Sequence, residues 1–367
     1  MKRLLCIVGG MEAGGGETFL MKLYRAVDRT AYQMDFCVSI KNKGFYDDEI
    51  ESMGGRIWHI TSKTENLHRF RSELAKVVKD GKYKYVLRVS SNGMGFLDLK
   101  IAKQAGAEIC SVRSSNSSDG GGFAAKAAHL IGRLLYSKYV DVKIAPSDLA
   151  GKYTFGKRAV ERGEVIFLNN GVDLEGFSFS EEGRRAVRKE LGIAESEFVV
   201  GHIGRFNTQK NHGYLLRIFA ELYKGKPESR LLLVGGGELE EEIKKQAEEL
   251  GVSGAVVFAG IRKDVPELLS AMDVFALPSF FEGMPNTVIE AQAVGVPCVI
   301  SDTITREANV TGTVRYLPIE AEPSLWASAL KDSREIRGSD LHALMLEKGY
   351  GIKEAADVFT SAVFGEK

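Results

Sequence analysis

The residues with the clearest chemical potential are two carboxylates, Glu282 and Glu290, which lie in the segment Pro278–Asp302. Pro285, between them, suits the first position of a helix, because the N–H group that proline lacks would have no partner there. Gly295 is expected to end that helix. A helix N-terminus offers free N–H groups to an anion. The segment therefore predicts a loop, a helix and a strand that present two acids and a phosphate-ready helix start to a ligand with phosphates and hydroxyls.

Two cations precede these acids and share one loop. Arg205 and Lys210 lie in Gly204–His212, directly after the apolar, strand-like run Val199–Ile203. Arginine offers a planar fork of donors and lysine a point charge, and this pair of groups suits a diphosphate. A solvated basic loop is the alternative. A position at a strand end, where the ligands of α/β sheets lie, favours the diphosphate site.

Glycine-rich turns follow other apolar runs. Gly14, Gly15 and Gly16 precede a helical stretch after the first run, and Gly236 follows Leu231–Val234. Glycine lets a backbone approach a ligand closely. The first turn is neither a Gly-x-Gly-x-x-Gly fingerprint nor a P-loop, so a tight structural turn is the alternative.

A further loop runs from Gly260 to Pro266. Backbone groups near Arg262 are placed to hydrogen-bond the edge of a base. Asp264 is expected to be the N-cap of the helix that follows, because a carboxylate at that position accepts a free N–H group.

The strands and helices that would position these residues follow one pattern along the whole chain. Apolar strand-like runs alternate with helical patterns, which predicts parallel sheets with helices on both faces, formed twice. A turn segment at Asn169–Gly176 separates the two series. We therefore expect an α/β fold in which the carboxyl ends of two sheets face each other across a cleft. The expected strands are Leu4–Val8, Met34–Val38, Arg56–Ile60, Tyr85–Val89, Glu108–Val112, Lys143–Pro146, Val165–Leu168, Val199–Ile203, Arg230–Val234, Val256–Ala259, Val274–Pro278 and Pro297–Ser301.

The composition is that of a globular protein with two ordinary domains. Of 367 residues, 44% are hydrophobic and 27% are charged, and the formal net charge is zero. That zero hides an asymmetry: residues 1–172 carry 27 Lys and Arg against 18 Asp and Glu (+9), and residues 173–367 carry 22 against 31 (−9). A basic first half suits an anionic partner such as nucleic acid, lipid headgroups or a phosphorylated acceptor. A chance imbalance of surface charge is the alternative.

The positions of the cysteines and histidines argue against a disulfide-bonded protein and against a metal-binding protein. Cys6, Cys37, Cys110 and Cys298 lie far apart in apolar runs, which predicts reduced core thiols in a cytosolic protein. Neither the cysteines nor the six histidines have metal-ligand spacing. No apolar run approaches the ~18–20 residues that cross a bilayer. The first apolar run is too short for a signal peptide and is expected to be a buried strand.

Together these segments resemble a known family. GRFNTQKNH (Gly204–His212), GIRKDVPELLSAMDVFALPS (Gly260–Ser279) and FEGMPNTVIEAQAVGVPCVISD (Phe281–Asp302) are similar to the retaining, family-four glycosyltransferases of GT-B architecture. NNGVD (Asn169–Asp173) lies where that family has its hinge, and Val8–Arg29 looks like the branch found in bacterial capsule and exopolysaccharide assembly. The resemblance implies two Rossmann-like domains: residues 1–172 for the acceptor and 173–349 for a nucleotide sugar, with a helix near 350–364 packing back on the first.

The resemblance also assigns roles. Arg205 and Lys210 would bind the donor diphosphate and stabilise the leaving group, and Glu282 would hold hydroxyls of the transferred sugar. These three residues would form the catalytic set. Glu290 would accept hydrogen bonds from the ribose. The remaining donor-binding residues would be Gly14, Gly15, Gly16, Gly236, Arg262, Gly283, Met284, Asn286, Thr287 and Val288. No metal and no cofactor are implied, because the two cations and the helix N-terminus would take the metal's place.

The expected activity is transfer of a hexosyl unit, with retention, from a nucleotide sugar to a glycan acceptor. The donor would be a UDP-sugar and the acceptor would be lipid-linked, in surface polysaccharide assembly, with no nucleic acid as partner. Two alternatives stay open: a non-hydrolysing UDP-sugar epimerase, and a catalytically degenerate sugar-nucleotide-binding subunit. A glycosidase with paired carboxylates is disfavoured, because it would have no use for Arg205 and Lys210.

The first domain departs from the family pattern. Members of this branch often carry histidines after two strands, where this chain has Arg88-Val89-Ser90-Ser91-Asn92 and Arg113-Ser114-Ser115-Asn116. Arg113 or Asn116 would then face an acidic or phosphorylated acceptor. Helices at Asn66–Asp80 and Phe123–Tyr139 mix basic and apolar residues, which suits contact with an anionic membrane at the inner face of the cell. Ordinary packing of amphipathic helices on the sheet is the alternative.

Overall fold

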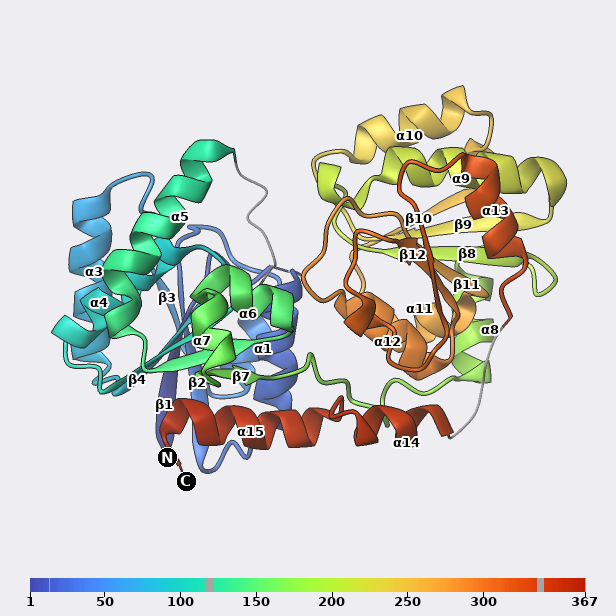
Figure 1. Ribbon diagram of the computed structural model, residues 1–367. Coiled ribbons are helices and arrows are strands. Elements are labelled where there is room, and N and C mark those ends of the chain that lie inside the picture. Colours follow the sequence, from blue (N-terminus) through green and yellow to red (C-terminus); the bar gives the residue numbers. More distant parts are fainter. Residues whose placement is uncertain (13, 116–121, 335–339, 367) are drawn as a thin grey trace. The chain divides into compact units, whose positions relative to one another are not determined.

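The computed structural model describes residues 1–12, 14–115, 122–334 and 340–366. The chain divides into two compact units (Figure 1). Unit 1 is formed by Met1–Gly171 together with Gly349–Lys367, and unit 2 by Val172–Lys348. The expected division lay between residues 172 and 173, so the observed one falls a single residue earlier.

Unit 1 is built on a parallel sheet with the strand order β3-β2-β1-β4-β5-β6-β7. Its strands are β1 (Lys2–Ile7), β2 (Tyr32–Val38), β3 (Ile57–His59), β4 (Tyr85–Val89), β5 (Ile109–Arg113), β6 (Val142–Ala145) and β7 (Val165–Phe167). The helices are α1 (Gly15–Ala26), α2 (Asp47–Ser52), α3 (Leu67–Asp80), η1 (Gly93–Gly95), α4 (Phe96–Gln104), α5 (Phe123–Tyr136), η2 (Ser137–Tyr139), α6 (Asp148–Phe155), α7 (Lys157–Glu161) and α15 (Ile352–Phe364).

Unit 2 repeats this design with the parallel order β10-β9-β8-β11-β12-β13. Its strands are β8 (Phe198–Ile203), β9 (Ser229–Val234), β10 (Val256–Gly260), β11 (Val274–Leu277), β12 (Cys298–Ser301) and β13 (Val314–Leu317). The helices are α8 (Glu181–Glu190), η3 (Thr208–Lys210), α9 (His212–Gly225), α10 (Glu240–Glu249), η4 (Ser253–Ala255), α11 (Val265–Ala271), α12 (Asn286–Val294), η5 (Arg306–Ala308), α13 (Pro323–Lys331) and α14 (Asp340–Glu347).

The expected strands are all present, with ends that differ by at most two residues. The sequence prediction missed β13, an edge strand that pairs only with β12. The prediction for Pro285 was wrong by one position. α12 begins at Asn286 and Pro285 is its N-cap, while Gly295 ends the helix in the left-handed conformation, at φ 85°. The four cysteines are buried and unpaired, as predicted.

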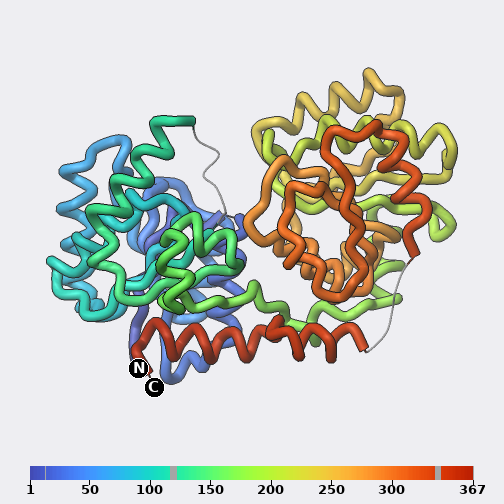
Figure 2. Tube along the Cα trace, in the orientation of Figure 1, coloured from blue at the N-terminus to red at the C-terminus, as the bar shows by residue number. Residues whose placement is uncertain are grey.

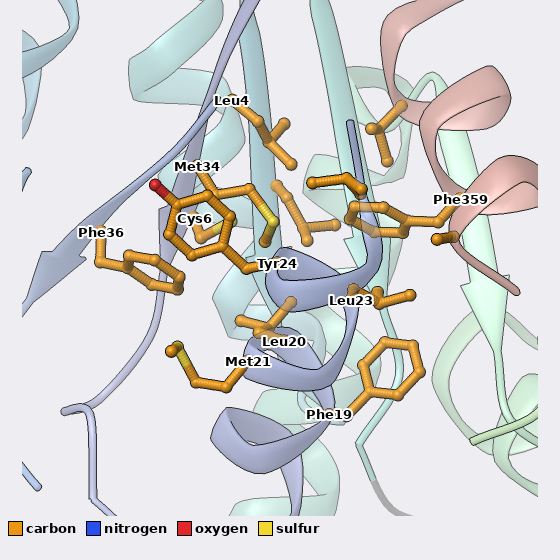
Figure 3. Packing of buried hydrophobic residues seen from close by; sticks show 14 of the residues in the cluster. Leu4, Cys6, Phe19, Leu20, Met21, Leu23, Tyr24, Met34, Phe36 and Phe359 are labelled. Atoms are coloured by element: carbon orange, nitrogen blue, oxygen red, sulfur yellow. The ribbon is translucent and has the colours of Figure 1, made fainter. Parts of the chain in front are cut away.

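The core of unit 1 includes a helix from the far end of the chain. Phe359 of α15 packs in the same cluster as Leu4 and Cys6 of β1 and Leu23 of α1 (Figure 3). Apolar side chains recur on one face of α15 at helical spacing, and that face is buried. The two ends of the chain meet beside this core, where Lys2 Nζ lies 2.6 Å from Glu366 Oε1 (Figure 2).

In both sheets the strand order reverses direction once, between β1 and β4 in unit 1 and between β8 and β11 in unit 2. Loops that leave such a switch point at the carboxyl ends of the strands form the usual ligand site of an open α/β sheet. In unit 2, the loops at this position are the loop after β8, which contains Arg205 and Lys210, and the loop after β11, which contains Glu282. Of the helices in the described ranges, none is long and apolar enough to span a bilayer.

Candidate active site

The loops after β8 and β11 hold each other at the switch point of unit 2. The backbone N–H of Phe280 donates to the Gln209 carbonyl at 2.9 Å. In return, Gln209 Nε2 donates to the Phe281 carbonyl at 2.8 Å. These reciprocal bonds fix the relative position of two loops that are far apart in sequence.

Lys210 and Glu282 form an ion pair where the two loops meet. Lys210 Nζ lies 2.7 Å from Glu282 Oε1, and Gln209 Nε2 lies 3.3 Å from Glu282 Oε2. The side chains are 16% and 9% exposed, so the pair is largely withdrawn from water. Asn207 Oδ1 accepts the Lys210 backbone N–H at 3.2 Å and thereby caps η3, which fixes the direction from which Lys210 leaves the backbone. The sequence placed both residues at a donor site but did not predict that they pair.

Arg205 lies in the same loop and has a different environment. Its side chain is exposed, and its guanidinium forms no hydrogen bond or ion pair with the described residues. The site therefore combines a neutralised lysine–glutamate pair with an uncompensated arginine, whose donors are available to an anion.

The N-terminus of α12 adds a third source of positive potential. Pro285 offers no capping side chain, and the Val288 N–H is already used by the Pro285 carbonyl, at 3.1 Å. Of the two expected phosphate donors, Thr287 is therefore the one whose N–H does not bond to Pro285. One turn later, Glu290 is buried, at 4% exposure. Met284 is also buried, at the end of the loop that leads into the helix.

The glycines after β9 have a structural reason of their own. A Cβ on Gly235, whose φ is 140°, would lie 2.1 Å from the Gly204 carbonyl oxygen, and a Cβ on Gly237 would lie 2.5 Å from that of Phe206. Gly236 is different, because the nearest neighbour of a Cβ there is an Ile261 side-chain atom at 3.5 Å. Two of the three glycines are thus needed for the loops after β8 and β9 to touch, and Gly236 is the one with free space.

Arg262 is held within unit 2 by two carboxylates. Its Nε and Nη2 lie 2.8 and 2.6 Å from the Asp264 carboxylate, and its Nη1 and Nη2 reach Glu190 of α8. The prediction that Asp264 caps α11 with its side chain was therefore wrong: Asp264 occupies the N-cap position without a capping hydrogen bond.

A pair of buried histidines lies beside Lys210, and the sequence reasoning missed it. His202 is the penultimate residue of β8 and His212 is the first residue of α9, and their ring centroids lie 4.6 Å apart. His202 Nδ1 donates to the Ala276 carbonyl at 2.9 Å, so its Nε2 carries a lone pair. A Cβ on Gly204 would meet both that Nε2, at 3.2 Å, and Lys210 Cε, at 3.0 Å, so these two groups flank the same small space.

Both imidazoles are kept neutral by their surroundings. Burial and then the Lys210 charge lower the pKa of His212 to about 4, and burial first and His212 second hold the pKa of His202 well below its usual range. His202 Nε2 and both ring nitrogens of His212 have no hydrogen-bond partner in the described chain. No three His, Cys, Asp or Glu residues are grouped as metal ligands in the parts that the structure describes. His212 lies in the segment Gly204–His212 that carried the family resemblance, and His202 lies two residues before it, but the histidines were weighed only for metal spacing.

In unit 1, the predicted glycines lie at the start of α1, and the predicted Arg113 contacts the same helix. Gly14 is the N-cap of α1, whose first residues are Gly15 and Gly16. Arg113, at the end of β5, stacks on Phe19 of α1, with its guanidinium carbon 3.5 Å from the ring centroid. Asn116 lies outside the described residues.

Arg113 is buried rather than open to a ligand. It is 2% exposed, its Nη1 donates to the Ser114 carbonyl at 3.1 Å, and its Nη2 donates to Asn170 in the segment that leads to unit 2. Burial lowers the pKa of its guanidinium to about 9, and no carboxylate among the described residues pairs with it. Arg88, the penultimate residue of the neighbouring strand β4, is different, since its Nε lies 3.0 Å from the buried carboxylate of Asp98.

Comparison with known proteins identifies the class. The family model for glycosyl transferases group 1 matches residues 183–314. The putative glycosyltransferase EpsF of Bacillus subtilis (strain 168) is 34% identical over 334 residues, which cover 90% of this chain and 87% of that protein. The chain therefore belongs to the group 1 glycosyltransferases.

A second relative is similar over part of its length. The UDP-Gal:alpha-D-GlcNAc-diphosphoundecaprenol alpha-1,3-galactosyltransferase of Escherichia coli is 34% identical over 142 residues, or 38% of this chain and 37% of that protein. Among solved structures, Anabaena Alr3699/HepE in complex with UDP-glucose superposes with a TM-score of 0.73 at 20% identity, covering 99% of this chain and 96% of that one. This likeness shows the fold, which is GT-B, with two Rossmann-like α/β domains.

Proposed function

We propose that this protein is a retaining, metal-independent hexosyltransferase that uses a UDP-sugar and a lipid-linked glycan acceptor in surface polysaccharide assembly. Unit 2 binds the donor and unit 1 binds the acceptor. The observation that carries the proposal is the grouping, at one switch point, of the Lys210–Glu282 ion pair, the unpaired Arg205 and the uncapped start of α12. Together they present positive potential beside a carboxylate that can accept hydroxyl groups.

This grouping suits a diphosphate leaving group. Arg205 supplies a fork of donors for phosphate oxygens, and the α12 N-terminus supplies N–H groups. Lys210 is held by Glu282 in the unliganded site and remains a fixed point charge when phosphate arrives. Cations positioned before the reaction stabilise the charge that develops in the transition state, which is the largest effect that most such sites provide.

The transfer step follows from these positions. The bond between the anomeric carbon and the diphosphate oxygen breaks, and its electron pair leaves with UDP, whose new charge Arg205 and Lys210 stabilise. The acceptor hydroxyl oxygen bonds to the same face of the anomeric carbon, and its proton passes to the departing phosphate oxygen. Glu282 holds hydroxyls of the transferred sugar, and Glu290 accepts hydrogen bonds from the ribose.

Two of the similar proteins support the choice of substrates. The E. coli relative is named for UDP-galactose and for an acceptor on diphosphoundecaprenol, and the HepE structure contains UDP-glucose. A Salmonella typhi relative named for Vi polysaccharide biosynthesis supports a polysaccharide product. A lipid-linked acceptor would place the enzyme in the cytoplasm at the inner face of the membrane. The burial of Arg113 favours a role in positioning the acceptor side of unit 1 over direct contact with an anionic acceptor.

The proposal is tested by UDP release from a panel of UDP-sugars, followed by product analysis with a lipid-linked oligosaccharide acceptor. Lys210→Met is expected to lower turnover about 100- to 1,000-fold, as the loss of a preorganised charge does in other transferases and hydrolases. Lys224→Met is the matched control, because Lys224 lies on the neighbouring helix α9 and its side chain is 71% exposed. The double variant Lys210→Met/Glu282→Gln separates loss of catalysis from the cost of leaving Glu282 unpaired.

The same assay discriminates between the alternatives. Transfer that continues in the presence of a chelator and gives a product with the donor's anomeric configuration supports the proposal. UDP-sugar interconversion without transfer would indicate an epimerase. Binding of UDP-sugars by calorimetry with no turnover of any donor and acceptor would indicate a degenerate subunit, and either of these results overturns the proposal.

A further inference from the structure

The ring of His202 links the two strands that part at the switch point of unit 2. The last paired residues of β8 and β11 are Gly201 and Phe275, and His202 comes directly after the first of them. The side chain continues the connection, because its Nδ1 donates to the Ala276 carbonyl of β11 at 2.9 Å. The ring also lies parallel to that of Phe275, with an interplanar angle of 5°. Contacts with β11 therefore fix the position of the ring and the nitrogen that carries its proton.

The other ring nitrogen of His202 is a buried acceptor. The residue is 0% exposed, and its Nε2 has no hydrogen-bond partner among the residues that the structure describes. The ring is neutral, because burial holds the pKa of His202 well below its usual range. A buried polar atom without a partner destabilises a fold, so each such atom needs an explanation. An apolar ring could pack against Phe275 without leaving an acceptor unsatisfied.

The donor nearest to this acceptor is on Lys210. A Cβ on Gly204 would lie 3.2 Å from His202 Nε2 and 3.0 Å from Lys210 Cε, and its next neighbour would be Lys210 Cδ at 3.3 Å. All three atoms nearest to that point thus belong to His202 and Lys210. Because residue 204 is a glycine, no side chain separates the imidazole from the end of the lysine.

Lys210 needs a second acceptor if the proposed transfer is correct. In the unliganded site its Nζ lies 2.7 Å from Glu282 Oε1, and Gln209 Nε2 already lies 3.3 Å from Oε2 of the same carboxylate. In the proposed reaction Glu282 also accepts hydroxyls of the transferred sugar, which compete with Lys210 for its oxygens. The ammonium has three N–H groups and is largely withdrawn from water, so it must find acceptors inside the protein.

We propose that His202 Nε2 accepts a hydrogen bond from the Lys210 ammonium when sugar hydroxyls engage Glu282, which makes His202 a positioning residue for the donor site. The lysine is then held between the imidazole and the diphosphate and keeps its place beside the leaving group. No proton is transferred: the ring stays neutral and Lys210 keeps its charge. This contact also explains the glycine at position 204, because a methyl group there would separate the two side chains. The inference rests on the proposed function for the event that displaces Glu282.

The first test observes the nitrogen itself by NMR of the full chain labelled with ¹⁵N-histidine. The signal of His202 Nε2 is assigned by its loss in His202→Phe. We expect it to move upfield, as a nitrogen does when its lone pair accepts a hydrogen bond, in the parent chain saturated with a UDP-sugar. It should move in the same direction without any ligand in Glu282→Ala, where Lys210 has lost its carboxylate. A signal that moves in neither sample overturns the inference.

The second test asks whether the ring acts through Lys210. Gly204→Ala and His202→Phe should each lower kcat for UDP release about tenfold, a smaller loss than removal of the lysine charge itself. In a Lys210→Met chain the same two substitutions should have little further effect, because their common target is gone. Gly225→Ala, at the exposed end of α9 where a Cβ meets nothing within 4 Å, is the control and should leave kcat unchanged.

A purely structural ring would give a different pattern. His202→Phe and Gly204→Ala would then lower kcat by the same factor with and without Lys210, and that result overturns the inference. The outcome is separable from that of the transferase proposal. If calorimetry finds no binding of any UDP-sugar, the transferase proposal fails, while the unliganded Glu282→Ala sample still reports whether Lys210 turns to His202.

Discussion

His212 should make unit 2 lose stability in mild acid. The unfolded chain binds a proton at His212 near its ordinary pKa of 6.5, whereas the folded chain binds one only near 4. Stability that depends on the neutral ring is therefore complete above pH 6.5 and is lost as the pH falls through this range. Two-state linkage between these values gives a loss of about 2 kcal/mol on going from neutral pH to about pH 5.

The measurement is urea unfolding of unit 2 at the two pH values, read from the fluorescence of Trp326. The chain contains two tryptophans, Trp58 in unit 1 and Trp326 in the core of unit 2, so Trp58→Phe makes the signal specific to unit 2. His212→Phe keeps an aromatic ring against Phe206 and removes the titrating group. The quantity compared is the change in unfolding free energy between the two pH values, so a constant packing cost of the substitution cancels.

We expect the His212→Phe chain to lose about 2 kcal/mol less than its parent on acidification. His202 adds a loss of the same sign in both chains, because burial lowers its pKa too. His68→Phe, at an exposed position on α3, is the control and should change nothing. If the parent and His212→Phe lose the same free energy between the two pH values, His212 is not neutral in the folded chain and the reasoning fails.

Three further predictions concern backbone packing and buried charges. Gly235→Ala should destabilise unit 2 by about 2 kcal/mol or more, because its φ and the Gly204 carbonyl exclude a Cβ, while Gly236→Ala should stay within about 0.5 kcal/mol; equal urea midpoints for the two would contradict this. Asp273→Asn should cost about 3 kcal/mol in the same assay, because the carboxylate accepts from two arginines, one of them fully buried, and from a backbone N–H. Arg113→Met should leave the unfolding of unit 1, followed by Trp58 in a Trp326→Phe chain, nearly unchanged while transfer falls at least tenfold; a large loss of stability with normal transfer would make Arg113 purely structural.

The strands could be predicted from the sequence wherever burial on both faces produces a run of apolar residues. Strands covered on both faces are continuous apolar runs, and Leu231–Val234 or Val274–Leu277 can be recognised without further information. β13 (Val314–Leu317) could not, because it is a short edge strand in which the exposed Arg315 interrupts the apolar run. These four residues form a strand because they pair with β12, and a local sequence pattern does not show that pairing.

The candidate site was predictable as a set of residues but not as a set of contacts. Lys210 and Glu282 were both assigned to the donor site, yet their ion pair joins positions 72 apart in sequence, which no local pattern encodes. The same separation hid the contact of Arg262 with Glu190. The role of a charged side chain depends on which opposite charge the fold brings near it. The order of the strands in the sheet decides which loops become neighbours, and a local sequence pattern does not show that order.

The position of α15 has a consequence for how the chain is made. Unit 2 is an insertion in unit 1, so the ribosome must synthesise Val172–Lys348, 177 residues (348 − 172 + 1), after the strands of unit 1 and before the helix that completes them. At ~5–20 residues per second this takes roughly 10–35 s. Throughout this interval the face of α1 and β1 that Phe359 covers has no partner from α15. Unit 2 can fold on the nascent chain before α15 exists, so unit 2 is completed first and unit 1, although its strands are synthesised earlier, is completed last.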